Sequence, residues 1–223
     1  MCGRFTLTAD PADLQQAFPQ FTFPQQIAPR FNIAPSQPVL AIPNDRQNAA
    51  DFFIWGLIPS WAKDPSIGSR LINARSETLS EKPSFRAGFK YRRCIIPADG
   101  FYEWKSQPGT KVKVPYFIQL RSRHLFAFAG LWGEWQSPDG SQIRSCTIIT
   151  TQPNEFMAAI HNRMPAILPT TAYPRWLDPT VQRLDELQSL LTPFPADEMA
   201  AHPVSTLVNN PANDRSECLV PAE

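Results

Sequence analysis

The first chemically informative residue is Cys2, which directly follows the initiator methionine in the opening stretch MCGRF. Aminopeptidases remove Met1 when the next side chain is small, and cysteine is small enough. The chain would then begin with an α-amine and a thiol on one residue, with pKa values of about 8 and about 8.5. Such a 1,2-aminothiol condenses with an aldehyde to close a five-membered ring. The alternative is that Cys2 is simply an early residue of a strand.

Two further stretches place polar side chains in apolar surroundings. In INARSET (residues 72–78), Asn73 and Arg75 point the same way if the segment is extended, and a guanidinium suits a phosphate oxygen. Alternatively, Asn73 caps a helix. In PADGFYEWK (residues 97–105), Glu103 stands between aromatic residues, which predicts a raised carboxyl pKa suited to proton transfer. The alternative is a solvent-facing position on an alternating strand.

Two more stretches carry single residues of interest. In IHNRMP (residues 160–165), His161 lies beside Arg163, and an imidazole can move protons near neutral pH. A structural or surface histidine is the alternative. In WGLIPSWAKD (residues 55–64), Trp61 precedes Lys63 and could stack on a nucleic-acid base. It could also be buried under its own loop.

The composition indicates a globular chain with a real core, since 43% of the 223 residues are hydrophobic. The sequence contains no apolar run of membrane-spanning length and no secretory signal, so we expect a cytoplasmic protein with no membrane contact, associated with the nucleoid if the source is bacterial. The four cysteines form no CxxC pair, which argues against disulfides and a zinc site. Cys94 and Cys146 lie in apolar runs and are expected to be buried. We expect no metal and no other cofactor.

The net charge of +1 is unevenly distributed along the chain. Residues 63–93 carry a net charge of +5 (eight basic against three acidic residues), and residues 178–223 carry −6 (two basic against eight acidic residues). Such a polarised chain can present a basic face to a polyanion while staying neutral overall. The alternative is that the basic residues form an ordinary solvated surface.

The predicted elements are mostly strands, over residues 39–43, 50–58, 94–104, 114–120, 125–132 and 144–151. Short helices are predicted in 8–18, capped by Thr8 or Asp10, over 154–160, and over 178–191, with Asp178 as N-cap and Pro179 at the first helical position. We see no repeat and no linker. The sequence therefore predicts a single α+β domain over residues 1–223, with a curved, mostly antiparallel, barrel-like β-sheet and a few peripheral helices.

The chain resembles the SOS response-associated peptidase (SRAP) family through an ordered set of motifs, namely MCGRF, RFNIAPSQ, WGLIPSW, INARSET, CIIPADGFYEWK, AGLW, TIITTQPN, IHNRMP and HPVS. Family members shield abasic sites in single-stranded DNA. The resemblance runs from residue 2 to about residue 209 and leaves an acidic C-terminal tail over 210–223. It departs at Asn162, where the family often has Asp.

The resemblance implies covalent binding to single-stranded DNA that contains an abasic site. An exposed Cys2 would condense with the ring-opened sugar aldehyde and form a thiazolidine DNA–protein crosslink. By motif, the catalytic residues are Cys2, Asn73, Glu103 and His161, and the DNA-binding residues are Arg4, Trp61, Arg75 and Arg163. Some members also remove their own N-terminal segment, but here only Met1 precedes Cys2, so aminopeptidase trimming would suffice.

Two other functions compete with this interpretation. One is an N-terminal-cysteine peptidase or amidohydrolase, in which the α-amine of Cys2 acts as the base. It would leave the basic segment at 63–93 unexplained. The other is a noncovalent reader of single-stranded or modified DNA that uses Trp61 and the arginines, whose binding would fall steeply with salt. We expect a monomer.

Overall fold

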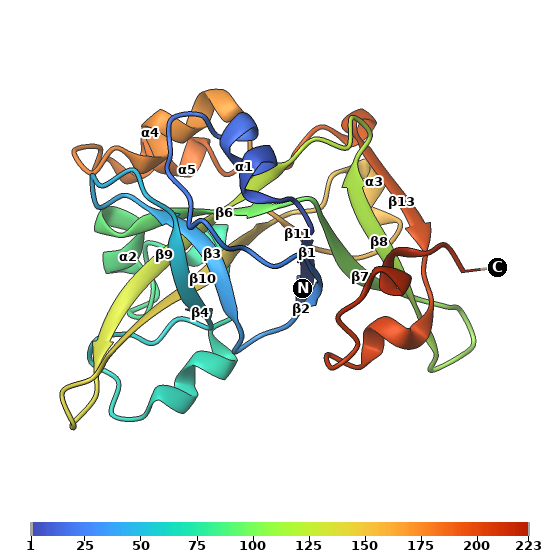
Figure 1. The fold of residues 1–223 in the computed structure, drawn as a ribbon, viewed down its shortest axis with the longest axis horizontal. Coiled ribbons are helices and arrows are strands. Elements are labelled where there is room, and N and C mark those ends of the chain that lie inside the picture. The colour runs from blue at the N-terminus through green and yellow to red at the C-terminus, as the bar shows by residue number, and fades with distance from the viewer. Residues whose placement is uncertain (1, 223) are drawn as a thin grey trace.

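A closed ring of five strands forms the centre of the computed structural model, which describes residues 2–222 (Figure 1). The removal of Met1 expected from the sequence concerns a residue outside the described part. The ring is formed by β10 (Gln142–Thr151), β4 (Asp51–Trp55), β3 (Pro38–Pro43), β6 (Arg93–Ala98) and β9 (Phe126–Gln136). It closes because β9 also pairs with β10. Closure leaves these strands without open edges.

Three short strands extend this sheet. They are β5 (Asn73–Arg75), which pairs with β10, β11 (Met164–Pro165), also on β10, and β12 (Ile167–Leu168), on β9. The pairings of β10 with β4 and with β5 are parallel, and the other pairings are antiparallel. The barrel-like, mostly antiparallel fold predicted from the sequence is therefore confirmed, with β10 as the exception.

A second, five-stranded antiparallel sheet lies beside the barrel (Figure 1). Its strands, in spatial order, are β13 (Met199–Pro203), β8 (Lys113–Leu120), β7 (Gly100–Ser106), β1 (Arg4–Leu7) and β2 (Arg30–Ile33). The chain passes from the barrel to this sheet between β6 and β7, at Asp99. The Asp99 carboxylate accepts hydrogen bonds from the Thr6 hydroxyl and from the Thr8 amide, the latter at 2.6 Å. These bonds fasten the crossing to β1.

The helices are short and peripheral. The α-helices are α1 (Pro11–Ala17), α2 (Arg86–Tyr91), α3 (Glu155–Ala158), α4 (Tyr173–Leu177) and α5 (Leu184–Ser189). The 3₁₀ turns are η1 (Pro65–Arg70), η2 (Ser76–Thr78), η3 (Thr170–Ala172), η4 (Ala196–Glu198), η5 (Thr206–Asn209) and η6 (Ser216–Leu219). None of the helices in residues 2–222 is long and apolar enough to cross a membrane.

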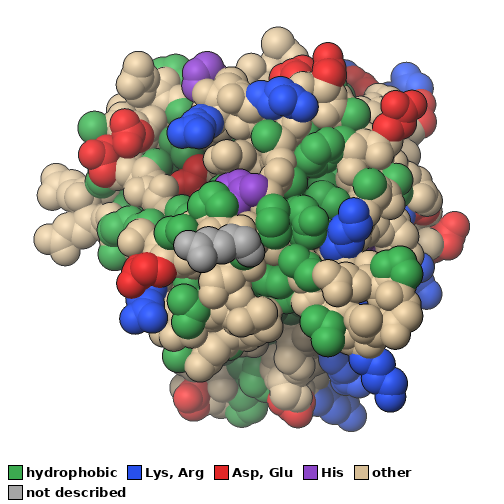
Figure 2. Space-filling model, turned by 90° about the vertical axis from the view of Figure 1, so that its right-hand side faces the viewer, with side chains coloured by type: hydrophobic (Ala, Val, Ile, Leu, Met, Phe, Trp, Pro, Cys, Tyr) green, Lys and Arg blue, Asp and Glu red, His purple; other side chains and the backbone are tan. Residues whose placement is uncertain are grey.

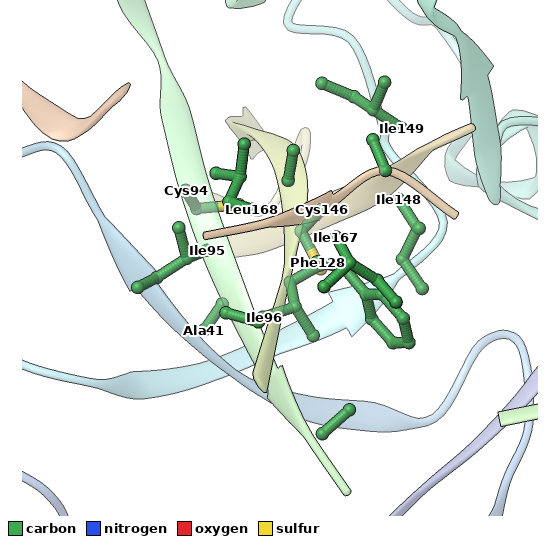
Figure 3. Close-up of a cluster of buried hydrophobic side chains, with 14 of the residues drawn as sticks. Ala41, Cys94, Ile95, Ile96, Phe128, Cys146, Ile148, Ile149, Ile167 and Leu168 are labelled. Atoms are coloured by element: carbon green, nitrogen blue, oxygen red, sulfur yellow. The ribbon is translucent and has the colours of Figure 1, made fainter. Parts of the chain in front are cut away.

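Alternating apolar side chains of the ring strands fill the barrel. Figure 3 shows Ile96 of β6, Phe128 of β9 and Ile148 of β10 among the buried side chains of this core. Cys94 and Cys146 belong to the same buried cluster, as their apolar runs predict. Burial of these aliphatic and aromatic side chains is the main stabilising contribution to the fold.

The N-cap predicted at Asp10 is confirmed, since its side chain accepts from the Asp13 amide. The helix predicted over 178–191 is confirmed only over its second half: the predicted start at Pro179 is wrong, because α5 begins at Leu184. The reason is the buried Arg93, whose guanidinium donates to the carbonyl oxygens of Asp178 at 2.7 Å and of Val181 at 3.0 Å. Those carbonyl oxygens therefore accept hydrogen bonds from Arg93 rather than from amides of a helix. The Asp178 side chain instead accepts from the Thr180 amide and closes a turn.

Residues 210–222 pack against the second sheet. Asp214 accepts from the backbone amides of Phe31 and Asn32, at 2.6 and 2.9 Å, and forms an ion pair with Arg30. At the end of the segment, the Ala222 amide donates to Pro203. The segment predicted as an acidic tail is thus part of the folded structure.

Candidate active site beside the first strand

The pairing of β1 with β7 brings the start of the chain to Glu103. Arg4 lies opposite Tyr102 in this antiparallel pair, so Cys2 reaches the part of β7 that carries Glu103. The Cys2 side chain is fully buried. This corrects the exposed thiol implied by the family resemblance. Burial, and secondarily the Glu103 carboxylate, raises the pKa of the Cys2 thiol, which is therefore neutral at pH 7.

Asn73 fixes the backbone of Cys2. Its side-chain amide donates to the Cys2 carbonyl oxygen at 2.7 Å. Asn73 can reach it because β5 runs parallel to β10, with Asn73 paired to Ile148. The Asn73 Oδ1 atom is buried and has no hydrogen-bond partner within the described residues. The strand conformation decides against the helix-cap interpretation, since the following 3₁₀ turn begins after Arg75.

Glu103 is the buried carboxyl group of the site. Only 2% of the residue is exposed, which excludes the solvent-facing alternative. Burial raises the pKa of the Glu103 carboxyl, in the direction that its aromatic neighbours in the sequence predict. A carboxyl group with a raised pKa can both take and return a proton near neutral pH.

His161 lies on the other side of Glu103. It follows α3, and its Nδ1 atom is 3.9 Å from Glu103 Oε1. The same nitrogen lies 3.1 Å from the Arg163 amide nitrogen, which donates to it, and 3.2 Å from the Arg163 carbonyl oxygen. The structure therefore brings the four predicted catalytic residues into one cluster, Cys2, Asn73, Glu103 and His161.

Arg163 adjoins this cluster but is occupied by protein groups. Its guanidinium donates to both carboxylate oxygens of Glu77, at 2.6 and 3.0 Å, and to the Thr150 carbonyl oxygen at 2.6 Å. Hydrogen bonding by Arg163 lowers the pKa of the Glu77 carboxyl. In this arrangement the terminal nitrogens of Arg163 are directed at Glu77 and Thr150, which differs from the phosphate contact expected for it.

Arg4 is similarly engaged within the protein. It donates to Asn32 Oδ1 at 2.8 Å and to the carbonyl oxygens of Val208 and Asn209 at 2.6 and 3.2 Å. Its guanidinium also lies 6.0 Å from the centre of the Trp104 ring. Arg4 thus ties the N-terminal strand to the C-terminal segment, a structural role that the sequence alone did not indicate.

The two remaining predicted DNA contacts are exposed. Arg75 ends β5, two residues from Asn73, and lies at the surface. Trp61 is 58% exposed, so it is not buried beneath its loop. It lines a cavity of about 350 Å³ with Tyr91, Arg92 and Trp132, which includes none of the four clustered residues.

Sequence reasoning missed Glu77, although it lies in the INARSET stretch that supplied Asn73 and Arg75. Its partner Arg163 is 86 residues away, and only the pairing of β5 and β11 with β10 brings the two together. Within residues 2–222, no cluster of three His, Cys, Asp or Glu side chains could hold a metal ion. The side chains around Cys2, namely its own thiol, the Glu103 carboxyl and the His161 imidazole, are nucleophilic and proton-transfer groups.

By its fold and site, the molecule is a barrel protein with a potential nucleophile at its amino end. Residues 1–211 match the family model described as SOS response associated peptidase (SRAP), and the chain belongs to that family. The family expected from the sequence motifs is thus confirmed.

Relatives agree with this assignment, and a solved structure shares the fold. The chain is 51% identical over 222 residues to the abasic site processing protein YoqW of Bacillus subtilis, covering 98% of this chain and 99% of YoqW. It is 36% identical over 247 residues to the abasic site processing protein HMCES of Rattus norvegicus, covering 94% of this chain and 69% of HMCES. A crystal structure of a Bacteroides thetaiotaomicron protein superposes with a TM-score of 0.89 at 25% identity, covering both chains completely.

Proposed function

We propose that this chain processes abasic sites in single-stranded DNA by forming a covalent crosslink through Cys2. The names of its relatives support abasic-site processing as the general role. The observation that carries the chemical proposal is the hydrogen bond from the Asn73 amide to the Cys2 carbonyl, beside the buried Glu103. This bond holds the amino end of the chain among groups that can move protons.

The reaction uses the two nucleophiles of Cys2 in turn. After removal of Met1, the α-amine adds to C1′ of the ring-opened abasic sugar, and the resulting carbinolamine loses one water to form an imine. The thiol then adds to the imine carbon, and its proton ends on the nitrogen. A thiazolidine ring results, with one water released and no oxidant or reductant consumed. Holding the aldehyde beside the aminothiol makes both steps intramolecular in effect.

The pKa directions favour this order of steps. A buried, neutral thiol is a poor first nucleophile, whereas an uncharged α-amine attacks an aldehyde readily. Glu103, with its raised pKa, accepts a proton from the nucleophile and returns it to the leaving hydroxyl. His161 protonates the sugar ring oxygen and so promotes the open aldehyde. The buried Asn73 Oδ1 offers an acceptor for the α-amine or for a sugar hydroxyl.

The same directions disfavour the peptidase alternative. A cysteine hydrolase needs a thiolate that attacks a carbonyl group, and its nucleophile is activated by a lowered pKa or an adjacent base. Here burial and the nearby Glu103 carboxylate both act against the thiolate. Arg75 and Trp61, which are exposed, hold the DNA strand by a phosphate contact and by base stacking. Arg4 contributes by holding the N-terminal strand against the C-terminal segment, and not by contacting DNA.

A denaturing gel tests the proposal. Tag-free protein, shown by mass to have lost Met1, is incubated with single-stranded DNA that contains one abasic site. We expect a shifted band that survives heat and detergent, and its loss in Cys2→Ala. Undamaged DNA is the matched control. A band of equal intensity with Cys2→Ala would refute the role of the thiol, and the absence of any band would leave the noncovalent reader.

A further inference from the structure

The ion pair between Glu77 and Arg163 joins two separate parts of the candidate site. Glu77 lies in η2, directly after the strand that carries Asn73, and Arg163 lies in the loop between α3 and β11 that also carries His161. Both carboxylate oxygens of Glu77 contact the two terminal nitrogens of Arg163. This bidentate geometry restricts the relative position of both segments more than a single contact would.

The ion pair is anchored to the barrel as well. Arg163 also donates to the Thr150 carbonyl oxygen at 2.6 Å, and Thr150 pairs with Arg75 of β5 and with Pro165 of β11. Only 10% of the Arg163 side chain is exposed, against 40% for Glu77. The guanidinium is therefore held by η2 and by β10 at once, while the Arg163 backbone lies in the loop that carries His161.

Arg163 transmits this restraint to His161 through its backbone. The Arg163 amide donates to His161 Nδ1 at 3.1 Å, and the Arg163 carbonyl oxygen lies 3.2 Å from the same nitrogen. Any movement of the Arg163 backbone thus changes the position of the imidazole and the contacts of Nδ1. The contact that a histidine makes with one ring nitrogen decides what its other nitrogen offers.

We propose that Glu77 is a positioning residue for the reaction at Cys2: by holding Arg163, it places the His161 imidazole beside Glu103. The inference rests on the proposed function for its chemical consequence. The structural part of the inference, that Glu77 holds His161 in place, can be tested on the protein without DNA. It differs from the expectation that Arg163 mainly contacts phosphate, because here the guanidinium acts through a carboxylate of the same chain.

The test uses the substitutions Glu77→Gln and Arg163→Lys in the full chain. Glutamine keeps the size of the Glu77 side chain but loses its charge. Lysine keeps the charge of Arg163 but cannot form the bidentate contact with Glu77. The matched control is Glu81→Gln, which removes an exposed carboxylate from the same part of the chain. Thermal melting establishes that each variant is folded.

Two measurements are made on each variant. The first is the rate of adduct formation at saturating abasic DNA, together with the equilibrium Kd for undamaged single-stranded DNA. The second is the pair of ring ¹⁵N chemical shifts of His161 in DNA-free protein, assigned by comparison with His161→Gln. The chain contains two other histidines, His124 and His202, which serve as internal references.

We expect Glu77→Gln and Arg163→Lys each to shift the His161 nitrogens and to slow adduct formation about tenfold, with Glu77→Gln leaving Kd within about twofold. The double variant should be no slower than the slower single variant, because both changes break one contact. Unchanged His161 shifts and an unchanged rate in Glu77→Gln would overturn the proposal. The proposal would also be overturned if Glu77→Gln bound DNA more tightly than Glu81→Gln does while its rate of adduct formation stayed unchanged. Glu77 would then merely compete with phosphate for Arg163.

The design separates this inference from the proposed function. If the wild-type protein formed no adduct, the proposed function would fail. A His161 spectrum shifted by Glu77→Gln would still establish that Glu77 positions the imidazole, and an unshifted spectrum would overturn that too.

Discussion

Glu103 and Cys2 share one buried environment, and at the residue scale this decides the chemistry. Burial raises the pKa of both groups, because each would have to hold a negative charge away from water. The Cys2 thiol is therefore neutral at pH 7, and the Glu103 carboxyl keeps its proton to a higher pH than an exposed carboxyl does. A carboxyl group whose pKa is shifted in this direction is suited to general acid–base catalysis near neutral pH.

The substitution Glu103→Gln should slow adduct formation about a hundredfold, because the amide cannot shuttle a proton. Equilibrium binding of undamaged single-stranded DNA should change little. Denaturing gels of reactions quenched at successive times give the rate of adduct formation. Fluorescence anisotropy with the same variant gives the Kd for undamaged single-stranded DNA. Equal losses in rate and in affinity would argue against a proton-transfer role.

The same substitution has a stability signature that depends on pH. The folded-state pKa of Glu103 lies above the ordinary value of 4.5, so the folded state holds this proton longer than the unfolded state. Wild-type stability conferred by this group therefore falls as pH rises from 4.5 through the folded pKa, and glutamine has no such dependence. We expect the Tm of Glu103→Gln relative to wild type to be higher at pH 7.5 than at pH 4.5. A pH-independent difference would contradict the raised pKa.

The sequence predicted which residues form the candidate site, but it did not predict their burial or their hydrogen-bond partners. The aromatic neighbours of Glu103 predicted the direction of its pKa shift, but the sequence left open whether the side chain is buried or faces solvent. In contrast, the burial of Cys2 depends on β7 pairing with β1, about 100 residues away in the chain. The engagement of Arg4 and Arg163 by carbonyl groups and Glu77 depends on equally distant contacts.

At the scale of elements, the crossing from β6 to β7 is what presents Glu103 to the first strand. Gly100 is required there by close packing. A Cβ atom at this position would lie 2.2 Å from the Phe117 ring and 3.0 Å from the Ile118 carbonyl oxygen. The crossing leaves no room for a side chain at Gly100 because the Phe117 ring of β8, the neighbouring strand of the sheet, lies against it.

Gly100→Ala should therefore lower the free energy of unfolding by about 1–3 kcal/mol, the usual cost of overpacking a core. Urea denaturation followed by tryptophan fluorescence measures this change. Gly109→Ala is less suitable as a control, since that glycine has a positive φ of 78°. Gly88→Ala, where the nearest atom lies at 3.5 Å, is the matched control and should cost little. Equal effects of both substitutions would contradict the packing argument.

The strands were predicted better than the helices, for a physical reason. Branched and aromatic residues are concentrated in 39–43, 114–120 and 144–151, and this strand-favouring composition is local. The failed helix start at Pro179 had suitable cap residues, but Arg93 of β6 takes the carbonyl oxygens of Asp178 and Val181. A cap preference of about 1 kcal/mol cannot compete with several hydrogen bonds to a buried guanidinium.

At the scale of the whole molecule, the basic and acidic segments of the sequence are not separated onto opposite sides. In Figure 1 helix α2, from the basic segment, lies on the left, and the acidic segment runs from α5, also on the left, to β13 on the right. Figure 2 shows the right-hand face, where basic and acidic side chains are interspersed with hydrophobic ones. DNA affinity should therefore depend on particular arginines rather than on a uniform basic surface.

Arg75→Ala tests this dependence. We expect weaker binding to undamaged single-stranded DNA and a slope of log K against log salt that is smaller by about 0.7, the value for one lost phosphate contact on a single strand. Arg121→Ala, an exposed arginine following β8, is the charge-matched control and should leave the slope unchanged. Equal slopes for the two variants would contradict a specific phosphate contact by Arg75.

The most direct test of the aminothiol mechanism is the intact mass of the adduct, measured with and without borohydride. We expect a mass equal to protein lacking Met1 plus abasic DNA minus one water, unchanged by borohydride, because a thiazolidine has no imine left to reduce. Cys2→Ser, whose hydroxyl closes a weaker ring, should instead trap efficiently only with the reductant. A wild-type adduct that gains two hydrogens with borohydride, or that maps to a lysine, would contradict the account.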